Sequence, residues 1–407
     1  MTRNADLVAR YGSPLYVYDL DRVTAARDSL LSSLPEGFEL FFSFKANPHP
    51  QIARALRGTG ERGCLAEISS TGELTAALEA GFTGSEMLYT GPGKTHEELR
   101  VAIGAGVTSF SVESPSDLRH VGEVATGYGV VADCLLRVNS ATSSAATSIR
   151  MTGTPSQFGI DSETLPELMP ELRAVPGTRL FGAHLFSLSN AKDEESLVGE
   201  FRHTISVAAR LRREVGLPVH LLDIGGGFAA PYLSPGERPA YPNLRAELED
   251  VLDEEFPDWR RGVPRIACES GRHLVGDCGE LLCTVVNVKE SRGRKFVILD
   301  AGINTLGGMS GLGRLLPVSV RLEETDPAER EVATLAGPLC TPGDVLGKNV
   351  PLPVLEVGDV VSIPNAGAYG MTASLLMFLG RPAPTEVVVR GGEVVSASRV
   401  EFTRKYD

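Results

Sequence analysis

The sequence predicts an α/β protein: a (β/α)8 barrel over residues 25–275, combined with a β domain, a sandwich or barrel, made of residues 1–24 and 276–407. Up to about residue 275, short apolar runs alternate with longer amphipathic stretches, which is typical of strand–helix units around a parallel sheet. About eight such units can be counted, the number that closes a barrel. After residue 276 the apolar runs become rich in β-branched residues and lose helical periodicity.

The elements follow in chain order. A first strand at 15–18 leads into a helix at 20–34, and this strand is a candidate to join the β domain. The barrel strands are expected at 39–44, 64–68, 87–90, 107–112, 132–138, 180–185, 219–224 and 265–269. The helices between them are expected at 49–58, 71–81, 94–105, 115–126 and about 195–215. The β domain should contain strands at 281–290, 295–300, 316–322, 331–336, 359–364 and 385–399. Residues 139–156, rich in Ser, Thr and Ala, are expected to form a mobile loop.

Composition excludes several classes of function. The 52 acidic residues outnumber the 39 basic ones, and a net charge of -13 argues against nucleic-acid or membrane binding. The six cysteines form no CxxC pair and no Cys/His cluster, which argues against zinc. Free thiols in a reducing compartment are the better interpretation. With no signal-peptide run and no long apolar stretch, a cytoplasmic location is expected.

Catalytic groups of such barrels lie at the carboxyl ends of the strands, and Lys45 directly follows the first barrel strand. An amine at the end of an apolar run is shielded from water, which favours the neutral form that Schiff-base chemistry needs. A lysine that extends from a loop into solvent is the alternative that this residue alone leaves open. Lysine is scarce here, with seven among 39 basic residues, so its position after a strand is informative.

Two further strand ends carry candidate groups. Gly225, Gly226 and Gly227 follow the seventh strand, and their unobstructed backbone N–H groups can form a phosphate nest. Glu269 and Arg272 follow the eighth, where a carboxylate can keep a pyridinium nitrogen protonated and an Arg can reach a phosphate. A flexible turn and a surface ion pair are the plain alternatives. Together with Lys45, these groups specify a site for pyridoxal 5'-phosphate (PLP).

On these residues the chain resembles the fold-type III PLP-dependent decarboxylases, the group of diaminopimelate, ornithine and arginine decarboxylases with an alanine-racemase-like barrel. The resemblance covers nearly the whole chain. The segments that carry it are 15–18, 44–47, 67–74, 90–94, 137–139, 157–160, 223–228, 269–272, 337–340, 367–370 and 384–387.

The resemblance implies roles for particular residues. Lys45 would bind the cofactor covalently, and Glu67 would lie close to the ring and to Lys45. Glu269 would hold the ring nitrogen, and Cys340 would protonate the former α-carbon. The phosphate would be held by Ser189, Gly226, Gly227, Arg272 and Tyr369, with Gly271 in the same segment as Arg272. The family also implies a homodimer in which Cys340 and Tyr369 are presented to the partner subunit's cofactor.

The sequence departs from the family at several positions. Phe186 stands where a ring-stacking His is usual, and His184, two residues earlier, is as readily a packed supporting residue. Thr341 stands where enzymes for diamino acids have an acid, although Asp344 lies close by. The Arg-Pro segment that grips diaminopimelate is replaced by a glycine-rich stretch ending at Arg314.

Thr341, Asp344 and Arg314 are therefore the candidate substrate contacts. These departures resemble the branch that includes the butirosin-pathway decarboxylase, which acts on a glutamyl group on an acyl carrier protein. The sequence thus predicts a PLP-dependent decarboxylase of an amino acid or a carrier-linked aminoacyl group, in specialised metabolism. The alternatives are a diaminopimelate decarboxylase that makes lysine, a racemase-like enzyme, and a PLP-binding protein without catalysis.

Overall fold

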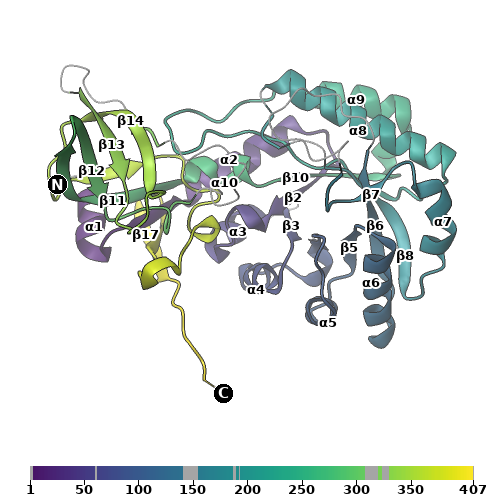
Figure 1. Ribbon diagram of the computed structural model, residues 1–407. Helices are drawn as coiled ribbons and strands as arrows, with labels where there is room; N and C mark the ends of the chain where they lie inside the picture. The colour runs from purple at the N-terminus through teal and green to yellow at the C-terminus, as the bar shows by residue number, and fades with distance from the viewer. Residues whose placement is uncertain are drawn as a thin grey trace. The chain divides into compact units, whose positions relative to one another are not determined.

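The computed structural model describes residues 3–59, 62–140, 155–186, 189–191, 193–307, 320–322 and 330–406 (Figure 1). The chain divides into two compact units. The barrel unit comprises Ala25–Ala229 and Pro239–Leu274. The sheet unit comprises Met1–Thr24, Ala230–Arg238 and Val275–Asp407. Residues 230–238 therefore group with the sheet unit, although they lie inside the range expected for the barrel.

The barrel unit is a closed ring of eight parallel strands, so the predicted fold class is confirmed. Each strand pairs with the next, and β10 pairs with β2 to close the ring. The strands are β2 (Glu39–Ser43), β3 (Leu65–Ile68), β4 (Met87–Tyr89), β5 (Ser109–Val112), β6 (Ala132–Asn139), β8 (Thr178–His184), β9 (Leu221–Asp223) and β10 (Arg265–Ser270). A two-residue strand, β7 (Ile160–Asp161), pairs with β6 outside the ring.

Helices alternate with these strands, and polar residues cap several of them. The helices are α2 (Leu20–Ser33), α3 (Pro50–Arg57), α4 (Thr71–Ala80), α5 (His96–Gly104), α6 (Pro115–Gly127), α7 (Leu165–Arg173), α8 (Glu194–Glu214), α9 (Leu244–Glu255) and α10 (Arg272–Val275). Ser70, Thr95, Ser114 and Asp193 accept hydrogen bonds from backbone N–H groups of the first turns of α4, α5, α6 and α8. These caps explain why the helices begin directly after the strand-end loops.

Apolar side chains form the barrel core. Phe41, Leu88, Leu135, Leu221 and Ala267, from β2, β4, β6, β9 and β10, make one buried cluster. A barrel interior filled by side chains is a rigid platform rather than a channel. It therefore holds the loops that follow the strands in fixed positions.

The sheet unit contains one sheet with the strand order β14-β13-β12-β11-β1-β16-β17, and β15 also pairs with β11. Its elements are α1 (Arg3–Tyr11), β1 (Leu15–Asp19), β11 (Gly279–Ser291), β12 (Arg294–Leu299), β13 (Arg330–Ala336), β14 (Val345–Pro353), β15 (Val360–Ile363), β16 (Thr385–Arg390) and β17 (Glu393–Arg399). Because β1 lies between β11 and β16, the expectation that the first strand joins the β domain is confirmed. Leu7, Leu15, Val17, Leu282 and Val387 belong to the core under this sheet.

The structure differs from the sequence prediction in a few elements. The sequence did not predict strands β7 and β14 or helices α1, α7, α9 and α10, and the single run expected at 385–399 is a hairpin that turns at Gly391 and Gly392. Of the strand expected at 316–322, residues 320–322 are irregular and the rest lies outside the described residues. Most of the loop expected at 139–156 also lies outside them.

Short 3₁₀ helices complete the described chain. They are η1 (Phe44–Ala46), η2 (Gly84–Glu86), η3 (Trp259–Arg261), η4 (Gly276–Cys278), η7 (Met371–Ala373) and η8 (Phe378–Gly380). Within the described ranges, no helix is both long and apolar enough to cross a membrane.

Candidate active site

Lys45 lies in η1, directly beyond the carboxyl end of β2. Its Nζ is 3.5 Å from the carboxylate of Glu67 and 5.5 Å from the ring centroid of Phe186. The side chain is 45% exposed, so the shielding expected from the apolar run is not seen. The reason is local: β2 ends at Ser43, and the 3₁₀ turn carries Lys45 past the buried layer. The amine is therefore reachable and is held between a carboxylate and an aromatic ring.

Glu67 is anchored from below. It is the penultimate residue of β3, is 3% exposed, and accepts a 2.6 Å hydrogen bond from the hydroxyl of Thr90, which follows β4. Thr90 in turn lies 2.9 Å from the hydroxyl of Ser69. Nζ of Lys45 lies 3.5 Å from both oxygens of this carboxylate, and Oε1 accepts from Thr90 as well as from Lys45. The structure thus brings Lys45 and Glu67 together, as expected.

The glycine segment after β9 lies against the same groups. A Cβ on Gly226 would be 2.6 Å from the carbonyl oxygen of Glu269 and 3.4 Å from the Phe186 ring, so no larger residue fits there. A Cβ on Gly271 would be 2.9 Å from Cβ of Ala46, beside Lys45. These close approaches place Gly226, Gly271, Phe186 and Glu269 at one end of the barrel.

The remaining predicted phosphate contacts of the barrel unit are found nearby. The backbone N–H of Ala191 donates a 2.8 Å hydrogen bond to the carbonyl of Gly227, which ties the segment of Ser189 to the glycines. Arg272 is the first residue of α10 and is partly exposed. Gly227 has φ of 125°, a conformation that favours glycine. Backbone N–H groups and a guanidinium at this end suit a phosphate.

Three ionisable side chains meet at the ends of neighbouring strands β8, β9 and β10. His184, Asp223 and Glu269 are each at most 2% exposed, and a ring nitrogen of His184 and a carboxylate oxygen of each acid lie within 4.8 Å of one another. His184 Nε2 is 3.2 Å from Glu269 Oε1, and its Nδ1 is 2.7 Å from the hydroxyl of Ser111 on β5. Asp223 accepts a 2.9 Å hydrogen bond from the N–H of Gly225.

These three groups shift one another's protonation. Burial by itself raises the pKa of Glu269, but the positive charges of His184, Lys45 and Arg137, with His184 the strongest, outweigh it and the pKa falls to about 2. Burial likewise disfavours charge on His184, yet Glu269 raises its pKa above the ordinary value. Burial, and then the charge of Glu269, raise the pKa of Asp223 to about 7. The favoured state is an ionised Glu269 beside an imidazolium.

The other predicted residues belong to the sheet unit. Cys340 is exposed and Thr341 partly exposed, in the loop between β13 and β14. Tyr369 is partly exposed with φ of 50°, and its carbonyl accepts a 3.0 Å hydrogen bond from the hydroxyl of Tyr232. Arg314 lies outside the described residues.

Asp344 differs from expectation. It is 3% exposed, and its two carboxylate oxygens accept hydrogen bonds from the N–H groups of Ile303 at 2.8 Å and Leu339 at 2.7 Å. A Cβ on Gly302 or Gly337 would collide with this carboxylate, so the loops close around it. These contacts favour a structural role, the shaping of the loop that carries Cys340, over the expected contact with substrate.

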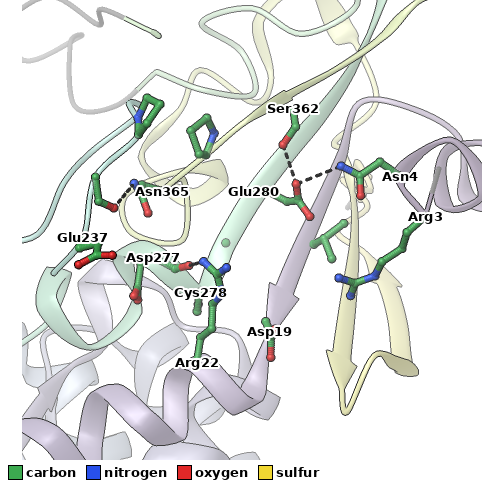
Figure 2. Close-up of a pocket in the computed structure, with 15 residues that line it drawn as sticks. Arg3, Asn4, Asp19, Arg22, Glu237, Asp277, Cys278, Glu280, Ser362 and Asn365 are labelled. Atoms are coloured by element: carbon green, nitrogen blue, oxygen red, sulfur yellow. Dashed lines mark hydrogen bonds between the residues drawn. The ribbon is translucent and has the colours of Figure 1, made fainter. Parts of the chain in front are cut away.

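A separate cavity of about 370 Å³ lies within the sheet unit (Figure 2). In it, Glu280 accepts hydrogen bonds from Ser362 at 2.6 Å and from Asn4 at 3.3 Å, and Arg22 donates to the carbonyl of Asp277 at 3.1 Å. None of the predicted site residues is among the described residues that line it. The site described above is therefore not this cavity.

Comparison with known proteins identifies the family. Residues 20–276 match the family model described as "Pyridoxal-dependent decarboxylase, pyridoxal binding domain". The chain belongs to the pyridoxal-dependent decarboxylase family. The predictions of the family, of PLP as cofactor and of a carboxy-lyase are thereby confirmed.

Individual relatives of this decarboxylase cover nearly all of both chains. L-glutamyl-[BtrI acyl-carrier protein] decarboxylase from Niallia circulans is 31% identical over 95% of this chain and 91% of its own length. Diaminopimelate decarboxylase from Methanothermobacter thermautotrophicus is 31% identical over 96% of this chain and 89% of its own length. The crystal structure of diaminopimelate decarboxylase from M. jannaschii in co-complex with L-lysine is 26% identical, with a TM-score of 0.79, over 96% of this chain and 90% of that one.

The residues of the barrel unit fit PLP. Asp223 Oδ2 and Ser270 Oγ are buried polar atoms without a hydrogen-bonding partner among the described residues, and His184 Nε2 and Glu269 Oε1 have only each other, at 3.2 Å. Such atoms are costly unless a ligand satisfies them. A protonated ring nitrogen would satisfy a carboxylate.

Sequence reasoning gave no role to three residues that build this site. Ser111 and Thr90 support His184 and Glu67, and Asp223 is the first residue of the segment 223–228, to which the sequence assigned no separate role. The available signal was the same in each case: a polar residue at the end of an otherwise apolar barrel strand.

Proposed function

We propose that this decarboxylase removes the α-carboxylate from an amino acid that is attached to a larger carrier, in specialised metabolism. One observation carries the proposal: the loop of Cys340 offers no free carboxylate. Thr341 is neutral, and both oxygens of Asp344 are engaged by backbone N–H groups. A free diamino acid needs an anionic partner for its distal ammonium, whereas an amide-linked substrate does not. The relative from Niallia circulans, whose name describes a carrier-linked glutamyl substrate, supports this reading.

When bound, PLP supplies the electron sink that accepts the bonding electrons of the departing carboxylate. The chain's own residues do the rest. Lys45 would hold the cofactor covalently, and Glu67 would orient the amine of Lys45. Glu269 would keep the ring nitrogen protonated. Gly226, Gly227, Ser189, Gly271 and Arg272 would hold the phosphate, and Phe186 would pack against the ring.

The sheet unit contributes a proton donor. Cys340 is the exposed thiol of this loop and would deliver a proton to the former α-carbon, and Tyr369 would contact the phosphate. We propose that both reach the site of a partner subunit, so that the enzyme works as a homodimer with shared sites. A cytoplasmic location belongs to the same proposal, because all six cysteines are free thiols.

The decisive experiment compares release of CO2 from a glutamyl group on an acyl carrier protein with release from free glutamate, diaminopimelate, lysine, ornithine and arginine. We expect the carrier-linked group to react and the free amino acids to react weakly. Strong turnover of free diaminopimelate would overturn the proposal and favour the alternative of a lysine-forming diaminopimelate decarboxylase. The relative from Methanothermobacter thermautotrophicus is named for that activity.

A pair of variants sharpens this comparison. Thr341→Asp restores a carboxylate beside Cys340, and a charge-assisted hydrogen bond should improve kcat/KM for a free diamino acid by about 10- to 150-fold. Thr341→Asn, of the same size but neutral, is the matched control and should give no gain. Equal effects of the two variants would show that charge at this position does not select the substrate.

A further inference from the structure

His184 is the central member of a buried chain of polar groups beneath the active site. Its Nδ1 lies 2.7 Å from the hydroxyl of Ser111, and its Nε2 lies 3.2 Å from Oε1 of Glu269. Ser111 is 0% exposed, and His184 and Glu269 are each 2% exposed, so water does not compete for these contacts. The chain joins β5, β8 and β10, three strands that are distant in the sequence.

Each ring nitrogen of His184 has one of these two contacts. Nε2 of His184 and Oε1 of Glu269 have no further hydrogen-bonding partner in the described part of the chain. The other charged groups that act on the pair come from three more strands: Asp223 at the end of β9, Arg137 within β6 and Lys45 after β2. Asp223 favours a charged His184, whereas Arg137 disfavours it. Glu269, at contact distance, favours the charged form of His184 more strongly than Arg137 disfavours it.

We propose that His184 is a positioning residue that, braced by Ser111, holds the carboxylate of Glu269 oriented and charged toward the ring nitrogen of the cofactor. A buried carboxylate without a cationic partner takes up a proton. A neutral Glu269 could no longer keep the ring nitrogen protonated, even though it would occupy the same place. His184 therefore acts on the cofactor through Glu269 and not by contact of its own. The inference rests on the proposed function, because it requires PLP in this site.

The test measures how well the enzyme distinguishes PLP from 1-deaza-PLP, an analogue with carbon in place of the ring nitrogen. Dissociation constants for both are measured by fluorescence titration of the apoenzyme. His184→Gln keeps a donor but no charge, and Ser111→Ala removes only the brace. Cys134→Ala, also in the barrel core but with its Sγ directed at the carbonyl of Ala132, is the matched control for a buried truncation.

We expect the wild type and Cys134→Ala to prefer PLP by at least about tenfold, the value of one charge-assisted hydrogen bond. The preference should fall to within about twofold in His184→Gln and to an intermediate value in Ser111→Ala, because affinity for the analogue does not use Glu269. The ¹⁵N signal of labelled PLP should show loss of ring protonation in His184→Gln. A structural role alone would weaken both ligands equally.

The failures are distinguishable. If the wild type binds neither compound, the proposed function is wrong. If it binds PLP with the expected preference and that preference is unchanged in both variants, the positioning role is wrong while the proposed function stands. Should His184→Gln fail to fold, the ratio of the dissociation constants for 1-deaza-PLP and PLP in Ser111→Ala decides the question.

Discussion

At the scale of single residues, Lys45 combines two properties that a cofactor-binding lysine needs. It is accessible at 45% exposure, yet its amine is held by Glu67 and lies over the ring of Phe186. A surface lysine has many rotamers of similar energy, whereas this one has a carboxylate and an aromatic face to select among them.

Replacement of Lys45 by Ala should abolish covalent attachment of PLP. After treatment with borohydride, the wild-type peptide that contains Lys45 should gain the mass of a reduced PLP adduct, and the variant should gain none. Lys348→Ala, at an exposed lysine of β14, should retain the adduct. An adduct at another lysine in the wild type would contradict the assignment.

Cys340 differs from the other five cysteines in exposure. Those five are buried, and burial raises their pKa values, to about 12 for Cys64, so they are poor nucleophiles at neutral pH. Iodoacetamide should therefore label Cys340 selectively and inactivate the enzyme. Cys340→Ala should bind PLP normally but lose about 10²- to 10⁴-fold in turnover, as expected for loss of a general acid.

Peptide mapping of the labelled protein checks the first part of this prediction, and a CO2-release assay checks the second. Labelling of Cys64 at the same rate would contradict the burial argument. Full activity of Cys340→Ala would remove the thiol from the proton-transfer step.

Residue positions at strand ends could be predicted because the sequence shows where an apolar run stops. The contacts between those ends could not, since Ser111, His184 and Glu269 are separated by 73 or more positions and meet only when the barrel closes. The structural use of Asp344 was also hidden, because backbone N–H groups that bind a carboxylate leave no mark in the sequence.

At the scale of elements, parallel strands buried on both faces appear as continuous apolar runs, which is why all eight barrel strands were predictable. The missed elements lack that pattern. Strand β14 contains a glycine, a lysine, an asparagine and two prolines, and α7 has Pro170 within it. The hairpin β16–β17 was predicted as a single run because its turn consists of two glycines only.

The pairing of β1 with β16 carries a pH-dependent cost. Glu386 on β16 is 6% exposed, accepts a 3.1 Å hydrogen bond from the hydroxyl of Tyr18 on β1, and burial raises its pKa from 4.5 to about 7. The folded state therefore binds the proton more tightly than the unfolded state does. The contribution of protonated Glu386 to the free energy of unfolding is complete below about pH 4.5 and is lost as the pH rises through about 7.

Glu386→Gln keeps the acceptor for Tyr18 without a charge. It should remove this pH dependence and raise the free energy of unfolding at pH 8 by about 1–3 kcal/mol, with little change at pH 4.5. Urea unfolding at the two pH values measures the difference. Glu393→Gln, at an exposed position of β17, is the control and should change neither value. A variant that is less stable than the wild type at pH 8 would show that the ionised form is favoured.

At the scale of the whole molecule, the net charge of -13 bears on the proposed carrier substrate. An acidic carrier would be repelled unless basic residues surround the entrance to the site. Arg314, one of the candidate substrate contacts, lies outside the described residues. In the part that is described, Arg381 donates a 3.4 Å hydrogen bond to the carbonyl of Pro338, in the loop that carries Cys340. Positive charge is therefore present at this loop.

The proposed sharing of sites between subunits can be tested by mixing two variants. If each site combines Lys45 of one subunit with Cys340 of its partner, then Lys45→Ala and Cys340→Ala damage different halves of the same site. Each variant is inactive or nearly so alone. In a mixed dimer, one site receives both damaged residues and the other receives neither, so one site per mixed dimer is intact. Random exchange makes half of the dimers mixed, and activity should recover to about a quarter of the wild-type value.

The experiment unfolds and refolds the two variants together at equal concentration and follows release of CO2. The matched control mixes Lys45→Ala with the double variant Lys45→Ala/Cys340→Ala, which can form no intact site under any arrangement. Recovery in the first mixture and none in the second requires that the two residues act across an interface. If the first mixture has only the mean activity of its two components, Lys45 and Cys340 act within one chain and the shared-site proposal is wrong.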